Sequence, residues 1–121
     1  MIRFAVTTLM TEHTEDDRLV LHLASDDHYL TLERRADFKP GRLGDIRFEN
    51  DGQTRKGYDV IRTFRFSRTL IAISLDPAKA ENFDGDHEFE IGFDIAEDDK
   101  APALRFLRRF FTDTTLLVVE E

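Results

Sequence analysis

The sequence predicts one α+β domain, a mainly antiparallel sheet of about six or seven strands on which a short helix and a C-terminal amphipathic helix pack. Three observations lead to this prediction. Apolar and polar residues alternate through most of the chain, a period of two that is typical of strands with one buried face. Near the C-terminus, apolar residues instead recur every three or four positions, as in a helix. The 121 residues contain no repeat or linker, so we expect a single domain over residues 1–121.

The first third of the chain is expected to form two consecutive hairpins. In the strand predicted at residues 18–24, Leu19, Leu21 and Leu23 share one face. Clusters of acidic and hydroxyl residues separate the strands, as is typical of turns. The predicted strands cover residues 2–9, 18–24 and 29–35, and the turns cover residues 11–17 and 25–27.

The middle of the chain continues with short strands between strong turn signals. One proline and two glycines mark a loop at residues 36–44, and the step Asn50-Asp51-Gly52 marks a turn. Alternation resumes on either side of that turn and breaks once more at Ser67 and Arg68. The predicted strands here cover residues 45–49, 58–66 and 69–75.

The C-terminal third combines one strand with two helices. Asp76 followed by Pro77 is a typical start for a short helix. Residues 86–95 alternate most regularly and predict a strand, and Asp98 or Asp99 then caps the amphipathic helix. The expected apolar face of that helix contains Ala103, Leu104, Leu107, Phe110 and Phe111, and its outward face contains Arg105, Arg108 and Arg109.

Composition excludes several classes of function. The chain has no cysteine, which excludes disulfides and thiol nucleophiles and agrees with a reducing cytoplasm. The N-terminal segment lacks the apolar core of a signal peptide. The longest run of large apolar residues is four, whereas a membrane span needs about 20. With 17 basic and 25 acidic residues the formal charge is −8, which argues against binding to a nucleic-acid backbone. We therefore expect a soluble cytoplasmic protein that binds neither membranes nor nucleic acids.

No motif for catalysis, metal binding or nucleotide binding is present. The four histidines do not occur at the spacings of metal sites. Carboxylates recur at every second position in residues 84–90, but Gly85 comes too early in that run for an EF-hand. We therefore predict no enzyme, no cofactor and no metal. Two alternatives remain: a small ligand-binding domain or enzyme that uses His22 or His28 beside a carboxylate, and a structural subunit of a larger assembly.

Charge is distributed unevenly along the chain. Residues 76–99 hold ten acids and one base, whereas residues 34–75 hold ten bases and five acids. An acidic surface can raise the rate of encounter with a basic partner by about 10- to 1,000-fold, although a solvated strand face gives the same pattern. Phe64 and Phe66, with Tyr58 and two arginines nearby, are a further candidate interface. The predicted partner-binding residues are Asp84, Asp86, Glu88, Glu90 and Asp94, with Asp16 and Asp17 as a second acidic group.

Five segments follow one another in a distinctive order: residues 29–35, the turn Glu49-Asn50-Asp51-Gly52-Gln53, a helix start at 75–80, the strand at 89–94 and the helix at 104–111. Their order and spacing, over about residues 15–112, resemble the immunity proteins of bacterial polymorphic toxin systems, family number ten. The resemblance implies a small cytoplasmic protein without catalytic residues or cofactor, which binds and neutralises a cognate toxin domain. We expect its acidic face to meet a basic cleft of the toxin. Nothing in the sequence indicates a homo-oligomer.

Overall fold

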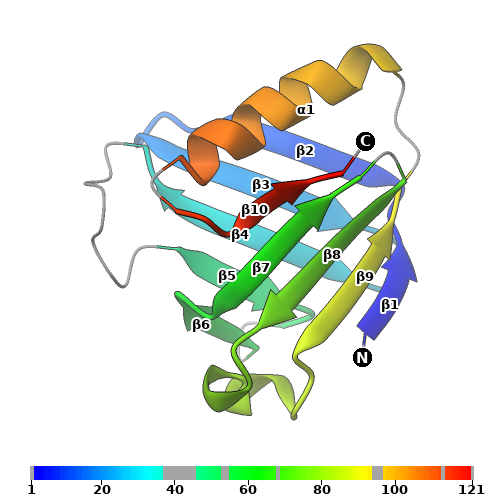
Figure 1. The fold of residues 1–121 in the computed structure, drawn as a ribbon, viewed down its shortest axis with the longest axis vertical. Coiled ribbons are helices and arrows are strands. Elements are labelled where there is room, and N and C mark those ends of the chain that lie inside the picture. Colours follow the sequence, from blue (N-terminus) through cyan, green and yellow to red (C-terminus); the bar gives the residue numbers. More distant parts are fainter. Residues whose placement is uncertain are drawn as a thin grey trace.

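Two five-stranded sheets and one α-helix make up the described part of the chain (Figure 1). The computed structural model describes residues 2–36, 46–52, 55–67, 69–93, 97–112 and 114–120. The predicted α+β class is confirmed. The elements are β1 (Ile2–Ala5), β2 (Thr8–His13), β3 (Arg18–Ala24), β4 (Tyr29–Arg35), β5 (Arg47–Asn50), β6 (Lys56–Tyr58), β7 (Ile61–Phe66), β8 (Leu70–Leu75), the 3₁₀ turns η1 (Pro77–Lys79) and η2 (Glu81–Phe83), β9 (Glu88–Gly92), α1 (Glu97–Phe110) and β10 (Leu117–Val119).

The strands pair mostly antiparallel, as predicted, but they form two sheets. The first sheet has the order β1-β9-β8-β7-β10, and the second has the order β2-β3-β4-β5-β6. In the first sheet β1 is parallel to β9 and β10 is parallel to β7. All the remaining pairs of neighbouring strands, in both sheets, are antiparallel. Ten strands in two sheets thus replace the single sheet of six or seven strands that the sequence predicted.

The additional strands have two origins. The segment predicted as one strand at residues 2–9 is divided at Val6 and Thr7, and its two halves join different sheets. The Val6 N–H donates to Gly92 in the first sheet, and the Thr7 N–H donates to Ala24 in the second. The remaining new strands, β6 and β10, are three residues long, too short for alternation to reveal them.

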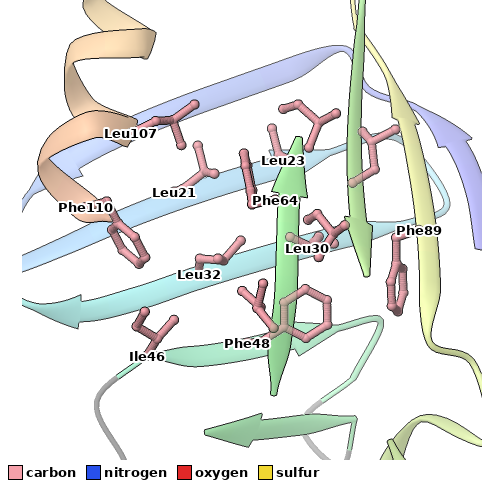
Figure 2. Close-up of a cluster of buried hydrophobic side chains, with 14 of the residues drawn as sticks. Leu21, Leu23, Leu30, Leu32, Ile46, Phe48, Phe64, Phe89, Leu107 and Phe110 are labelled. Carbon is pink, nitrogen blue, oxygen red and sulfur yellow. The ribbon is translucent and has the colours of Figure 1, made fainter. Parts of the chain in front are cut away.

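The inner faces of the two sheets form one hydrophobic core (Figure 2). Leucines of β3 and β4 face the aromatic rings of the first sheet, and the Phe48 ring lies edge-on to Phe83 and Phe89 at 5.4 and 5.3 Å. Phe64 and Phe66 are only 0% and 5% exposed, so the aromatic interface predicted around them is wrong. They face the core because β7 directs them inward, and of the three aromatic residues in that group only Tyr58 is exposed.

Helix α1 packs its apolar face on this core, as the spacing predicts. Ala103, Leu107 and Phe110 are buried, and Arg105 is exposed on the opposite side. The helix begins at Glu97, slightly before the expected aspartate cap. Its other end is held by Arg34 of β4, which is 2% exposed and donates from Nη1 to the Phe110 carbonyl at 2.6 Å. A cation at this position also offsets the negative end of the helix dipole.

The turn predicted at residues 11–17 is shorter than expected, because Thr11–His13 continue β2 and only residues 14–17 connect β2 to β3. The other described turn signals act as predicted. Asp76 Oδ1 accepts a hydrogen bond from the Ala78 N–H at 3.0 Å and starts η1, which with η2 forms the expected short helical segment. Asp51 and Gly52 have φ of 56° and 144° in the turn between β5 and β6. The loop predicted at residues 36–44 lies, apart from Ala36, outside the described residues. No described helix has the length and apolar character that crossing a membrane requires.

Candidate binding surfaces

Four of the predicted acidic residues lie on β9 or in the loop just before it. Along β9 two apolar residues turn inward, and Glu88 and Glu90 therefore lie on the outer face of the first sheet. Asp84 and Asp86 precede them in the loop that follows η2. We name these four residues the β9 acidic surface. Asp94, which was predicted for the same surface, lies outside the described residues.

Arg55 binds two of these four carboxylates. Its Nη1 donates to Asp84 Oδ2 at 3.1 Å and its Nη2 donates to Asp86 Oδ2 at 3.3 Å. The guanidinium also donates to the backbone and side-chain oxygens of Asn50 and lies 5.7 Å from the centre of the Phe83 ring. Only 16% of the Arg55 side chain is exposed, against 88% for Asp84. Arg55 therefore joins the β5–β6 turn to the loop before β9.

Glu88 and Glu90 have partners on the neighbouring strands. Glu90 Oε2 accepts a hydrogen bond from Arg3 Nε at 2.9 Å, and Glu88 Oε2 accepts one from the Ser74 hydroxyl at 2.6 Å. The Arg3 side chain is 71% exposed, so its ion pair with Glu90 contributes little to stability. Because Arg3 and Arg55 bring positive charge to this surface, it is less negative than the sequence alone indicates, and its carboxylates are oriented.

The second predicted acidic group, Asp16 and Asp17, lies in the β2–β3 turn, far from the loop before β9 (Figure 1). Asp17 has a φ of 64°, and its Oδ1 lies 2.6 Å from His13 Nε2. Asp16 accepts hydrogen bonds from the Thr14 hydroxyl and, at 3.1 Å, from Arg18 Nε. The hydrogen bond from Thr14 is the main reason that the pKa of Asp16 is lowered from its ordinary value. The structure does not bring the two acidic groups together.

A polar network on the outer face of the second sheet was not predicted from the sequence. The Tyr29 hydroxyl donates to Glu49 Oε2 at 2.6 Å, and Arg47 donates to the other oxygen of the same carboxylate. Arg18 Nη1 donates to Glu33 Oε1 at 2.8 Å, and Arg47 Nη1 lies 4.0 Å from Glu33 Oε2. We name Arg18, Tyr29, Glu33, Arg47 and Glu49 the outer-face network.

This network shifts the pKa of two of its members. Burial raises the pKa of Glu49, but the hydrogen bonds from Tyr29 and Arg47 outweigh that effect and the net pKa is lowered. The same hydrogen bond to Glu49 raises the pKa of Tyr29. Opposite charges at outward strand positions were the available signal in the sequence. That signal was insufficient because strand register, which places Glu33 opposite Arg47, was not known.

The alternative prediction used His22 or His28, which lie on β3 and in the β3–β4 turn of the second sheet. His28 Nδ1 is 2.7 Å from Asp51 Oδ2, while Asp51 Oδ1 accepts the backbone N–H of the residue after His28 at 2.8 Å. The His28 ring also stacks on Phe4 with 5.1 Å between centroids. His22 Nδ1 is 2.9 Å from Thr31 Oγ1. Within the described residues no group of three or more histidines and acids is placed to hold a metal ion.

A scan against models of protein families and searches of curated proteins and of solved structures give no match. Each carboxylate of the β9 acidic surface accepts a hydrogen bond, and Asp84 is largely open to solvent. The His28–Asp51 contact lies in a turn that also holds the start of β4.

Proposed function

We propose that this chain is an immunity protein, which binds a cognate bacterial toxin domain in the cytoplasm and neutralises it by stoichiometric association. The observation that supports this most is the β9 acidic surface, where one strand and its preceding loop carry four carboxylates within seven residues. The order of segments that resembles immunity family ten agrees with the proposal. Such a function depends on a binding surface that blocks the toxin and on no catalytic group.

The β9 acidic surface suits a basic cleft. Arg55 holds Asp84 through Oδ2, and the side chain is 88% exposed, so Oδ1 is open to a lysine or arginine of the toxin. Glu90 is held in the same manner through Oε2. Side chains that are already oriented lose less rotamer freedom when a partner binds. The net negative charge of the chain also favours rapid encounter with a basic domain.

The alternative function, a ligand-binding domain or enzyme with a histidine beside a carboxylate, has the His28–Asp51 contact in its favour. Both groups, however, have structural partners: Asp51 caps the start of β4 through Oδ1, and His28 stacks on Phe4. These contacts favour a role in holding the β5–β6 turn against β4. We therefore expect His28→Gln to leave toxin neutralisation unchanged.

The proposal is tested by co-expression with the product of the adjacent upstream reading frame. We expect that product to stop growth when it is expressed alone, and this chain to restore growth and to co-purify with it as a 1:1 complex. A neighbouring product that is harmless, or one that remains toxic and does not co-purify, would contradict the immunity function.

The surface used for binding is tested separately. Glu88→Lys plus Glu90→Lys should weaken the complex by about 10- to 100-fold, because both side chains reverse charge on the proposed contact. The thermal midpoint should change little, since the Arg3 side chain that pairs with Glu90 is 71% exposed. Asp98→Lys plus Asp99→Lys is the matched control, with the same change in net charge at the start of α1, far from the loop before β9 (Figure 1). Equal affinities of the two variants would exclude the β9 acidic surface and leave the immunity function standing.

A further inference from the structure

β2 is an open edge of the second sheet (Figure 1). It pairs with β3 on one side, and no strand of the described chain pairs with its other side. Five of its six residues are exposed and Leu9 is half-buried. Edge strands are commonly protected from pairing by lysine, proline, a bulge or very short length. β2 is six residues long and has no lysine, proline or register shift.

The ladder between β2 and β3 determines which backbone groups remain open. The Thr14 N–H donates to the Arg18 carbonyl at 2.8 Å just beyond the strand. In an antiparallel ladder the bonded pairs then recur at every second residue, so alternate residues of β2 direct their N–H and C=O groups toward β3. The N–H and C=O groups of Leu9, Thr11 and His13 therefore point away from the sheet. They form a row of three unpaired donor–acceptor sites, the pattern that an added strand binds.

Four exposed acids lie around this row without an ion-pair partner among the described residues. Glu12 lies on β2, Glu15 lies just after it, and Asp26 and Asp27 lie in the β3–β4 turn beside its start. All four are exposed, and none forms an ion pair with another described residue. Met10, between the two acidic ends, is 52% exposed. The edge therefore combines open backbone groups, one apolar side chain and negative charge at both ends.

We propose that β2 binds an extended, basic segment of a protein partner by strand addition, so that the segment becomes a sixth strand of the second sheet. The partner backbone pairs with Leu9, Thr11 and His13, an apolar side chain covers Met10, and lysines or arginines lie beside Glu12 and the acidic ends. This inference rests on the proposed function, because it assigns the segment to the toxin.

Charge determines the occupant. A second copy of this chain would pair its β2 antiparallel to the first, which places Asp26 and Asp27 of one copy near Glu15 of the other. Such like-charge contacts at both ends oppose self-association. A basic segment meets complementary charge at the same positions and gains the same backbone hydrogen bonds. The edge is therefore protected against its own copy and open to a basic partner.

The experiment uses the full chain and a fluorescent synthetic peptide, as long as β2, that alternates lysine and valine. We expect the peptide to bind the wild-type chain and to slow amide hydrogen exchange at Leu9, Thr11 and His13, the groups that become paired. Thr11→Pro removes an outward N–H without removing a β2–β3 bond, and should weaken binding by about tenfold or more. Thr11→Ala, which keeps the N–H, is the matched control. A glutamate–valine peptide should not bind.

Three results would overturn the inference: a lysine–valine peptide that does not bind, equal binding by Thr11→Pro and Thr11→Ala, or slowed exchange at residues outside β2. If Thr11→Pro does not fold, Glu12→Lys takes its place, since it leaves the backbone intact and should also weaken binding. The two proposals fail in different ways. If the Thr11→Pro variant binds the toxin with full affinity and neutralises it, β2 is not the binding site and the immunity function still stands. Peptide binding at β2 without neutralisation of the neighbouring product would keep the edge and exclude that function.

Discussion

The β9 acidic surface and the β2 edge are both rich in carboxylates, but they differ in what surrounds those carboxylates. At β9, Arg55 and Arg3 contact three of the four acids, and Ser74 contacts the fourth. Around β2, the exposed Glu12, Glu15, Asp26 and Asp27 form no ion pair with another described residue. Acidic side chains with internal counter-charges help to hold a fold together, whereas those without them repel one another.

The difference shows that the density of acids in a sequence does not measure the charge of the surface they form. The β9 segment is the most acidic part of the chain by sequence, yet its counter-charges come from residues that are far away along the chain. Arg55 is 29 residues from Asp84, and Arg3 is 87 residues from Glu90. The two regions can be separated by experiments that remove a counter-charge, titrate a paired acid or reverse a charge.

Removal of the counter-charge at β9 should have the largest effect on stability. Arg55→Ala leaves the buried Asn50 without two hydrogen bonds and releases Asp84 and Asp86, so we expect a loss of about 2–3 kcal/mol in the free energy of unfolding. Urea unfolding measures this. Arg62→Ala is the control, since Arg62 is exposed and forms no ion pair with another described residue; it should cost less than about 0.5 kcal/mol. Equal losses in the two variants would show that Arg55 does not tie this region together.

Much of the fold could be predicted from the sequence because the alternating pattern is local. The strands predicted at residues 18–24 and 29–35 match β3 and β4, and the spacing of Ala103, Leu107 and Phe110 predicted the buried face of α1. The division of the chain into two sheets could not be predicted. It depends on the crossing at Val6 and Thr7 and on the parallel pairing of β10 with β7, which long-range packing determines.

The candidate surfaces were predicted less completely than the fold. Alternation correctly placed Glu88 and Glu90 outward, because the side-chain period of a strand is two. It could not show that Arg3 pairs with Glu90, or that Arg47 and Tyr29 meet at Glu49, since these contacts depend on which strands are neighbours. The open edge at β2 was missed for the same reason, because only the sheet order shows which strand lies at an edge.

The outer-face network provides a paired acid that can be titrated. The pKa of Glu49 is lowered in the folded chain, so its carboxylate stabilises the fold above the ordinary value of 4.5, and that stability is lost as pH falls through the folded pKa. Glu49→Gln should therefore cost about 1 kcal/mol near neutral pH and progressively less in acid. Urea unfolding at a series of pH values measures the difference. Glu12→Gln, at an exposed acid that forms no ion pair with another described residue, is the control and should cost much less than Glu49→Gln near neutral pH. A Glu49→Gln deficit that persists undiminished below the lowered pKa of folded Glu49 would mean that packing, and not charge, is responsible.

The smallest expected effect is on the free energy of unfolding, which charge reversal should raise at the β2 edge and lower at the β9 acidic surface. Glu12→Lys plus Glu15→Lys relieves repulsion among acids that have no counter-charge, and should raise the free energy of unfolding by a few tenths of a kcal/mol at low ionic strength. Asp84→Lys places a cation beside Arg55 and should lower it by a similar amount. Both changes should shrink when salt is added, because the side chains are exposed and salt screens them. Matched urea titrations at low and high salt measure both. If the two variants change stability in the same direction, the carboxylates of β9 and those around β2 have the same electrostatic surroundings. The distinction between carboxylates that are paired within the chain and carboxylates that are left for a basic partner then does not hold.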